Sequence, residues 1–263
     1  MRKPSAQTLQ LGLEGLTDEN LGWFTCHGIF TANYIDKHLK PSNQVRSPQQ
    51  VAAIYDQLKA LWQSNYEGLR RRNEDYTRSQ FIDAVLKALG WEFIPEMHLP
   101  TGEWQTKKRP DYCLFENEAD RVLAAAMVTP SEVYSRSSSV IEAKQVGVPL
   151  DKAGSEKADR GQLPSQQIQD YLQRAKDGNG RYFNWAILTN GSEWRLYCER
   201  AANDASFGFR LAIGPDFCPI DEFRAFVTLF EPGAFAIIDK RCLLDDTPMP
   251  MATPRWPMSG SRR

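Results

Sequence analysis

The feature of this sequence that most restricts the fold is a series of short predicted strands that precede and follow one predicted helix along the chain. The helix covers residues 164–175, where Ile168, Tyr171 and Leu172 recur at helical spacing. Short apolar runs bounded by turn residues predict strands at 91–94, 111–115, 139–144, 182–188, 194–197 and 207–213. This order predicts an α/β fold in which helices flank a central sheet of mixed direction.

Further helices are predicted from their boundary residues. The motif Ser47-Pro48-Gln49-Gln50 combines an N-cap, a proline in the first turn and a capping-box partner, so a helix should begin there. Thr77-Arg78-Ser79-Gln80 repeats the capping-box pattern and predicts the start of a second helix, which ends at Gly90. A further helix is predicted over 221–230 from its apolar face.

Length and composition fit one large folded domain with appendages. A chain of 263 residues, 41% of them hydrophobic, can bury a core without disulfides or a structural metal. We expect an N-terminal extension at 1–46 and a folded domain at 47–244, in which 116–138 is an insertion. Residues 245–263 are rich in Pro, Met, Ser and Arg, which predicts a flexible tail.

Charge, cysteine usage and hydropathy narrow the function classes. The net charge of −1 excludes a uniformly basic nucleic-acid-binding surface but allows a local basic groove. The 5 cysteines are scattered and never occur as CxxC, which argues against a disulfide framework or a zinc site. The sequence contains neither an apolar run near the ~18 residues of a membrane helix nor an apolar signal core. We therefore expect a cytoplasmic protein without a membrane partner.

Two carboxylates and a lysine lie at the ends of two predicted strands. Asp111 begins one strand, and Glu142, Ala143 and Lys144 end another. Because side chains alternate along a strand, Glu142 and Lys144 should share one face, with Ala143 on the other. Two carboxylates from neighbouring strands can hold Mg²⁺, which lowers the pKa of bound water and neutralises charge on a phosphate. The lysine can orient or deprotonate that water, or stabilise the charged phosphate.

The order Pro110-Asp111, then Glu142-Ala143-Lys144, resembles the signature of PD-(D/E)xK nucleases. Gln167-x-x-x-Tyr171 is similar to the QxxxY motif of type I restriction nuclease domains. The segment 188–197 resembles the hairpin of those domains and of the N-terminal nuclease part of type IIG restriction–modification enzymes. The segment 77–91 resembles their first helix and following turn, so the resemblance covers roughly residues 47–235.

The resemblance implies a restriction-endonuclease-like core and an Mg²⁺-dependent DNA endonuclease, the cleavage module of a restriction–modification system, in which Mn²⁺ can substitute. Its partners would be double-stranded DNA and methyltransferase or specificity modules in the same or another chain. Asp111 and Glu142 would be metal ligands, with the Ala143 carbonyl as a candidate third, and Lys144 would be the catalytic lysine. Gln167 would support catalysis or contact the DNA backbone.

Several alternatives remain open at this point. Many PD-(D/E)xK nucleases carry an acidic residue on the first helix, where this sequence offers Gln80 with Glu74 and Asp83 nearby, so the number of metals is undecided. Tyr171 fits core packing as well as DNA contact. The basic run Lys107-Lys108-Arg109 precedes Asp111 and fits either phosphate contact or a solvated surface. Two rival functions are a non-catalytic nuclease-fold module that binds DNA or a partner protein, and an unrelated metal-dependent enzyme.

Overall fold

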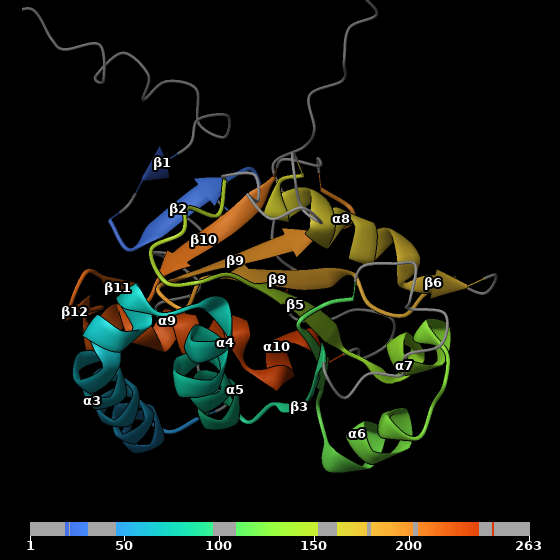
Figure 1. Ribbon diagram of the computed structural model, residues 1–263, viewed down its shortest axis with the longest axis horizontal. Coiled ribbons are helices and arrows are strands. Elements are labelled where there is room, and N and C mark those ends of the chain that lie inside the picture. The colour runs from blue at the N-terminus through green and yellow to red at the C-terminus, as the bar shows by residue number, and fades with distance from the viewer. Residues whose placement is uncertain are drawn as a thin grey trace, which may run out of the picture.

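A mixed sheet of eight strands crosses the molecule, with helices on both of its faces (Figure 1). The computed structural model describes residues 19–20, 22–30, 46–96, 109–151, 162–177, 180–201, 205–236 and 244. Within them the strand order of the sheet is β1-β2-β10-β9-β8-β5-β4-β3. This architecture confirms the predicted α/β class with a mixed central sheet.

The strands of this sheet pair antiparallel except for β5 and β8, which pair in parallel. The chain that connects these two strands contains the helix α8. The sheet contains β1 (Glu19–Asn20), β2 (Phe24–His27), β3 (Glu92–Pro95), β4 (Tyr112–Phe115), β5 (Ser139–Ala143), β8 (Trp185–Thr189), β9 (Glu193–Cys198) and β10 (Ser206–Arg210). Two further pairs are β6 (Lys176–Asp177) with β7 (Gly180–Arg181), and β11 (Ala212–Ile213) with β12 (Asp216–Phe217).

The helices are α3 (Pro48–Arg71), α4 (Glu74–Thr77), the π-helical segment η3 (Arg78–Ile82), α5 (Asp83–Leu89), α6 (Glu118–Ala125), α7 (Pro130–Arg136), α8 (Pro164–Arg174), α9 (Ile220–Phe230) and α10 (Pro232–Phe235). The helices predicted from Ser47, from Thr77 to Gly90, over 164–175 and over 221–230 lie close to those positions, whereas α4, α7 and α10 were not predicted. Ser47 caps α3 through the predicted capping box, and Gly90 ends α5 with a φ of 89°. Both boundaries confirm the sequence prediction.

The predicted capping box at Thr77 is wrong. The cap lies at Asn73, whose side chain accepts from the Tyr76 N–H, and the helical backbone then continues through Thr77. Thr77 is buried, and its hydroxyl accepts a hydrogen bond from the Val146 N–H at 3.2 Å. The threonine therefore joins the helix to the chain that follows β5, a tertiary contact that the local motif does not reveal.

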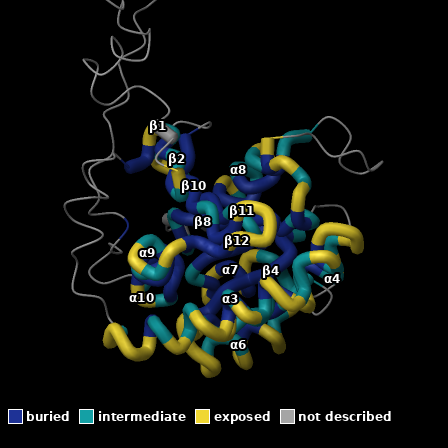
Figure 2. Tube along the Cα trace, turned by 90° about the vertical axis from the view of Figure 1, so that its left-hand side faces the viewer, coloured by how far each residue is buried: buried dark blue, intermediate teal, exposed yellow. Residues whose placement is uncertain are grey.

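Two hydrophobic cores lie on opposite faces of the sheet, and the buried residues between the helices and the sheet are dark blue in Figure 2. Along β5, Ile141 and Ala143 belong to the larger core, whereas Val140 belongs to the core beneath α8. This alternation follows the period of a strand and turns Glu142 toward α8. The prediction that Glu142 and Ala143 lie on opposite faces of β5 is therefore confirmed.

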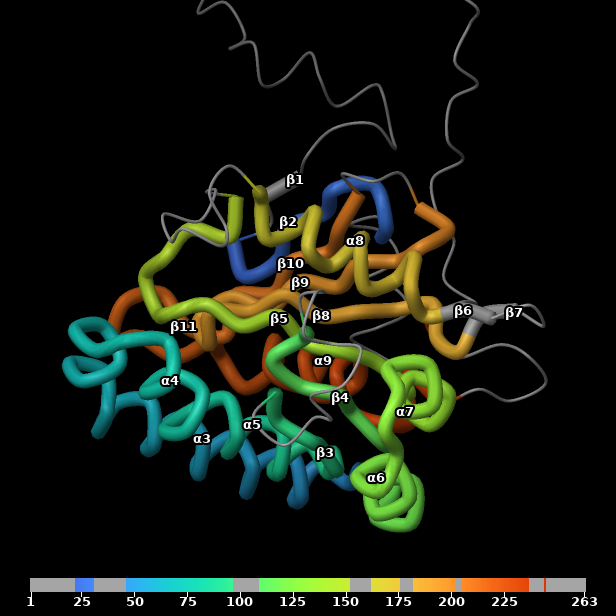
Figure 3. The backbone as a smooth tube through the Cα atoms, turned by 45° about the vertical axis from the view of Figure 1, so that its right-hand side comes forward, coloured from blue at the N-terminus to red at the C-terminus, as the bar shows by residue number. Residues whose placement is uncertain are grey.

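Part of the predicted N-terminal extension belongs to the sheet. Strand β2 pairs with β10, with Phe24 opposite Phe209. These two rings pack edge-to-face, with their centroids 5.1 Å apart. The predicted insertion 116–138 forms α6 and α7, which pack on β3 and β4 (Figure 3). The predicted tail 245–263 lies outside the described residues.

No helix in the described ranges is both long enough and apolar enough to span a membrane.

Candidate active site

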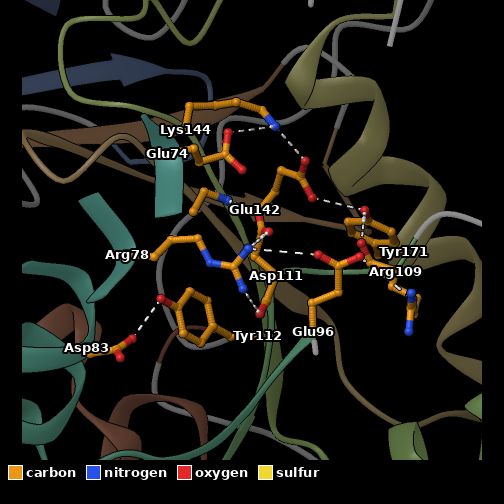
Figure 4. A network of polar contacts seen from close by, with 11 residues as sticks. Glu74, Arg78, Asp83, Glu96, Arg109, Asp111, Tyr112, Glu142, Lys144 and Tyr171 are labelled. Carbon is orange, nitrogen blue, oxygen red and sulfur yellow. Dashed lines mark hydrogen bonds and ion pairs between the residues drawn. The ribbon is translucent and has the colours of Figure 1, made fainter. Parts of the chain in front are cut away.

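The structure brings Asp111, Glu142 and Lys144 together where β4 and β5 lie side by side (Figure 4). These strands pair antiparallel with Tyr112 opposite Ile141, so extending the register by one residue sets Asp111 beside Glu142. The Asp111 Oδ2 atom accepts a hydrogen bond of 2.6 Å from the Ala143 N–H. Two residues that are 31 positions apart in the sequence therefore share one small region because of strand pairing.

Glu142 lies at the centre of this region, and both of its carboxylate oxygens are bound. Lys144 Nζ is 2.8 Å from Glu142 Oε1, and the Tyr171 hydroxyl on α8 is 2.9 Å from Glu142 Oε2. The same hydroxyl lies 2.8 Å from the carbonyl oxygen of Arg109, so its single proton can serve one of the two acceptors at a time. Glu74 on α4 approaches Lys144 Nζ to 3.7 Å from the other side.

Asp111 is paired with Arg78, a residue that the sequence analysis did not single out. Arg78 Nη1 is 2.7 Å from Asp111 Oδ1, and Nη2 donates to the Asp111 carbonyl oxygen at 3.2 Å. The guanidinium also lies over the Tyr112 ring, and the Tyr112 hydroxyl donates to Asp83. These contacts fasten the first residue of η3 to the start of β4. Rare π-helical turns often occur at functional sites, but no pattern in the sequence predicted this one.

The polar residues on this helix differ in whether they face the candidate site. Gln80 is exposed, with its amide beside Ser79, whereas Glu74 and Arg78 face the carboxylates. These two residues are four positions apart, so they lie on one face of the helix. That spacing was the one signal that could have indicated Arg78.

Burial and mutual repulsion shift the carboxyl groups toward their neutral forms. Burial, followed by the charge of Asp111, raises the pKa of Glu142 to about 8. The same two causes raise the pKa of Glu74 to about 7. Burial also raises the pKa of Asp111, although Arg78 and the Ala143 N–H oppose this shift. Any proton held by these carboxyl groups would be displaced when a divalent cation binds.

Lys144 experiences the opposite balance. Burial alone would lower the pKa of its ammonium group, but Glu142 and Glu74 outweigh burial and raise the pKa above its ordinary value. Lys144 is therefore positively charged near neutral pH. In this arrangement it can donate hydrogen bonds and stabilise negative charge, and it is not placed to act as a base.

The donor set fits one hard divalent cation more readily than a larger metal cluster. Asp111 and Glu142 provide two adjacent carboxylates, and carboxylate oxygens are ligands that hard divalent cations prefer; burial is the main cause of the raised pKa of each group. Among the described residues, no group of three or more His, Cys, Asp or Glu side chains is placed to hold a metal. Backbone carbonyls such as that of Ala143 would have to complete the coordination.

The remaining predicted site residues occupy varied positions. Gln167 is buried on α8, one turn before Tyr171. The Arg109 side chain pairs with Glu96, its Nε 3.7 Å from Glu96 Oε1. Lys107 and Lys108 lie outside the described residues. Among the described residues predicted to contact DNA, Tyr171 touches a proposed metal ligand, Glu142, through its side chain.

The hairpin between β8 and β9 holds the chain that carries Lys144. The Lys144 N–H donates to the Thr189 carbonyl oxygen at 2.7 Å, and Asn190 Nδ2 donates to the Val148 carbonyl oxygen at 2.9 Å. Gly191 has a φ of 84°, and a Cβ there would lie 3.4 Å from Thr77, Phe81 and Val146. The Asn-Gly turn therefore forms the hairpin and also fixes the segment after the lysine.

Comparisons of this chain with protein-family models, with curated proteins and with solved structures give no match. The assignment of a function therefore depends on the geometry of the site and on the order of its motifs.

Proposed function

We propose that the protein is an Mg²⁺-dependent DNA endonuclease that serves as the cleavage module of a restriction–modification system. The observation that carries this proposal is the convergence of Asp111, Glu142 and Lys144 where the paired strands β4 and β5 begin and end, in the sequence order of a PD-(D/E)xK motif. The parallel pair β5 and β8, joined through α8, supports a restriction-endonuclease-like core. Tyr171 adds a contact from the helix that carries the QxxxY-like motif.

In this proposal Asp111, Glu142 and the Ala143 carbonyl would hold Mg²⁺, with Mn²⁺ as a substitute. The bound cation would lower the pKa of a water molecule and neutralise charge on the scissile phosphate. Lys144 remains an ammonium group that orients the attacking water and stabilises negative charge on a phosphate oxygen. Tyr171 holds the Oε2 atom of Glu142 and so fixes the direction in which this carboxylate points.

A specific observation favours the second candidate, a non-catalytic module that binds DNA or a partner protein. Each oxygen of the two carboxylates already has a partner: Arg78 and the Ala143 N–H for Asp111, and Lys144 and Tyr171 for Glu142. A buried polar cluster that is fully paired can be retained for structure alone. A cation would have to bind through the remaining lone pairs of these oxygens or displace one of these contacts.

The proposed substrate is double-stranded DNA, and the proposed location is the cytoplasm. The sequence contains no G-x-x-x-x-G-K-[ST] loop and no Asn-Pro-Pro-Tyr motif. We therefore propose that methylation, sequence recognition and any ATP-driven movement come from methyltransferase or specificity modules, in the same or another chain.

The direct test of the enzyme proposal is cleavage of supercoiled plasmid with Mg²⁺ or Mn²⁺, with and without EDTA. We expect nicked and linear products that require the metal, and loss of both products in Asp111→Asn. Calorimetric titration with Ca²⁺ should show binding to the wild type and weaker binding to Asp111→Asn. If the wild type binds DNA but leaves the plasmid intact under all of these conditions, the non-catalytic module is the better account.

A further inference from the structure

Three consecutive arginines end the long helix α3. Arg70 and Arg71 form its last turn, and Arg72 follows as the C-cap with an extended backbone. All three are exposed, and the side chains of Arg70 and Arg71 are 54% and 72% accessible to solvent. A run of arginines at a helix end is often only a solvent-exposed surface. The residues around it are therefore needed to argue for a binding function.

The segment 144–146 runs beside the chain that begins with these arginines. Lys144 Nζ is 3.7 Å from Glu74, and Gln145 Nε2 donates to the Arg70 carbonyl oxygen at 3.4 Å. The Val146 N–H donates to Thr77 at 3.2 Å. Three successive residues after β5 therefore contact the segment 70–77, so the chain that carries the arginines runs beside the segment that begins with the proposed catalytic lysine.

The arginine cluster keeps an excess of positive charge. Glu67 is the acidic partner of both Arg70, at 3.6 Å, and Arg71, at 3.1 Å, so one carboxylate faces two guanidinium groups. Arg72 lies over the Tyr76 ring at 4.6 Å, which orients its guanidinium without neutralising it. Exposed ion pairs of this kind are weak and can be exchanged for a phosphate.

We propose that Arg70, Arg71 and Arg72 bind the phosphate backbone of duplex DNA beside the candidate site. This proposal rests on the proposed function, because it takes DNA as the substrate. Arginine suits the role because its planar fork pairs with phosphate through two parallel hydrogen bonds. A protein with a net charge of −1 needs a local basic surface of this kind to attract DNA.

The test measures binding of a fluorescent DNA duplex in Ca²⁺ over a series of salt concentrations. The variant Arg70→Gln/Arg71→Gln/Arg72→Gln removes the cluster, and Arg70→Lys/Arg71→Lys/Arg72→Lys keeps its charge. The matched control Arg121→Gln/Arg136→Gln/Arg224→Gln makes the same change in net charge elsewhere. Arg224 forms an exposed i,i+3 pair with Asp221, like that of Arg70 with Glu67. Figure 2 shows α9, which carries Arg224, and α4 on opposite sides of the molecule.

We expect the cluster variant to bind at least about tenfold more weakly and to lose about one unit of salt slope for each phosphate contact removed. The lysine variant should retain most of the slope, and the control should stay within about twofold of the wild type. The proposal is overturned if cluster and control variants bind alike while both melt at the wild-type temperature, or if the wild type does not bind duplex DNA.

Plasmid cleavage by the same proteins separates this inference from the proposed function. If the wild type cleaves and the cluster variant binds and cleaves like the control, the arginine surface is wrong and the nuclease stands. If binding depends on the cluster but no protein cleaves, the nuclease is wrong and the arginine surface stands.

Discussion

Arg78 Nη1 lies 2.7 Å from Asp111 Oδ1, so the first residue of the π-helical turn covers one oxygen of a proposed metal ligand. The Asp111 side chain is 8% exposed and that of Arg78 is 12% exposed, so water screens this pair little. An arginine thus supplies the positive charge at a point where a divalent cation would otherwise balance Asp111. A metal bound at Asp111 Oδ1 would share this oxygen with Arg78 or displace the guanidinium.

Replacement of Arg78 tests this relationship. Arg78→Ala leaves the buried Asp111 without its cation, so we expect the free energy of unfolding to fall by about 3 kcal/mol. The control Arg121→Ala removes ion pairs with Glu92 and Glu118, whose side chains are all at least 30% exposed, and should cost less than about 1 kcal/mol. Urea unfolding measures both. Equal losses in the two variants would show that the Arg78–Asp111 pair contributes nothing particular to stability.

The raised pKa values of Glu142 and Glu74 predict how stability depends on pH. Both groups titrate near 4.3 in an unfolded chain and at about 8 and 7 in the folded protein. Between these values the folded state binds more protons than the unfolded state, so stability falls as pH rises from about 5 to 8. Glu142→Gln should flatten this fall, whereas the exposed Glu118→Gln should reproduce the wild-type profile. Thermal unfolding at several pH values gives the answer, and a wild-type slope in Glu142→Gln would refute it.

Local signals in the sequence identified the ends of elements, and long-range pairing decided the rest. Ser47 and Gly90 act within their own turns, so their patterns predicted helix ends correctly. Thr77 carries the same local pattern, yet its hydroxyl bonds to Val146, which is 69 residues away. Similarly, Arg78 meets Asp111 across 33 residues. A motif that depends on a distant partner cannot be read from its neighbours.

The sheet also contains features set by one strand alone and features set by distant strand pairing. Alternation along β5 predicted correctly that Glu142 and Lys144 would share a face, because that property belongs to one strand. Strand β2 was not predicted, because its place in the sheet depends on β10, which lies about 180 residues later. The relative placement of Glu142 and Lys144 could therefore be predicted from the sequence, whereas the N-terminal part of the sheet could not.

The Tyr171 hydroxyl should matter for Glu142 beyond core packing. Tyr171→Phe keeps the buried ring and removes the contact with Glu142 Oε2, so we expect a loss of about 1–2 kcal/mol in stability. Plasmid cleavage should also slow, because the carboxylate is less well fixed. The control Tyr182→Phe removes an exposed contact with Ser131 and should cost less than about 0.5 kcal/mol. Unfolding in urea compares the two, and equal values would assign Tyr171 to packing alone.

Replacing two glycines with alanine distinguishes the cost of a left-handed backbone from the cost of close packing. Gly147 and Gly191 have nearly the same φ, 85° and 84°, but a Cβ at Gly147 meets no atom within 4 Å. Gly147→Ala should therefore cost about 1 kcal/mol for the left-handed backbone alone. Gly191→Ala should cost up to about 1 kcal/mol more, because its Cβ would lie 3.4 Å from Thr77, Phe81 and Val146, at the near edge of ordinary van der Waals contact. Urea unfolding measures the difference, and equal costs would show that the hairpin does not hold the segment after Lys144.

Single-turnover cleavage of plasmid by Lys144→Ala is the measurement that tests the nuclease account most directly. Lys144 is proposed to orient water and stabilise charge, while Asp111 and Glu142 hold the metal, so the variant should bind Ca²⁺ and lose at least about 100-fold in rate. The control Lys87→Ala, on the exposed side of α5, should cleave at the wild-type rate. Cleavage by Lys144→Ala at the wild-type rate, with equal thermal stability, would contradict the proposed mechanism.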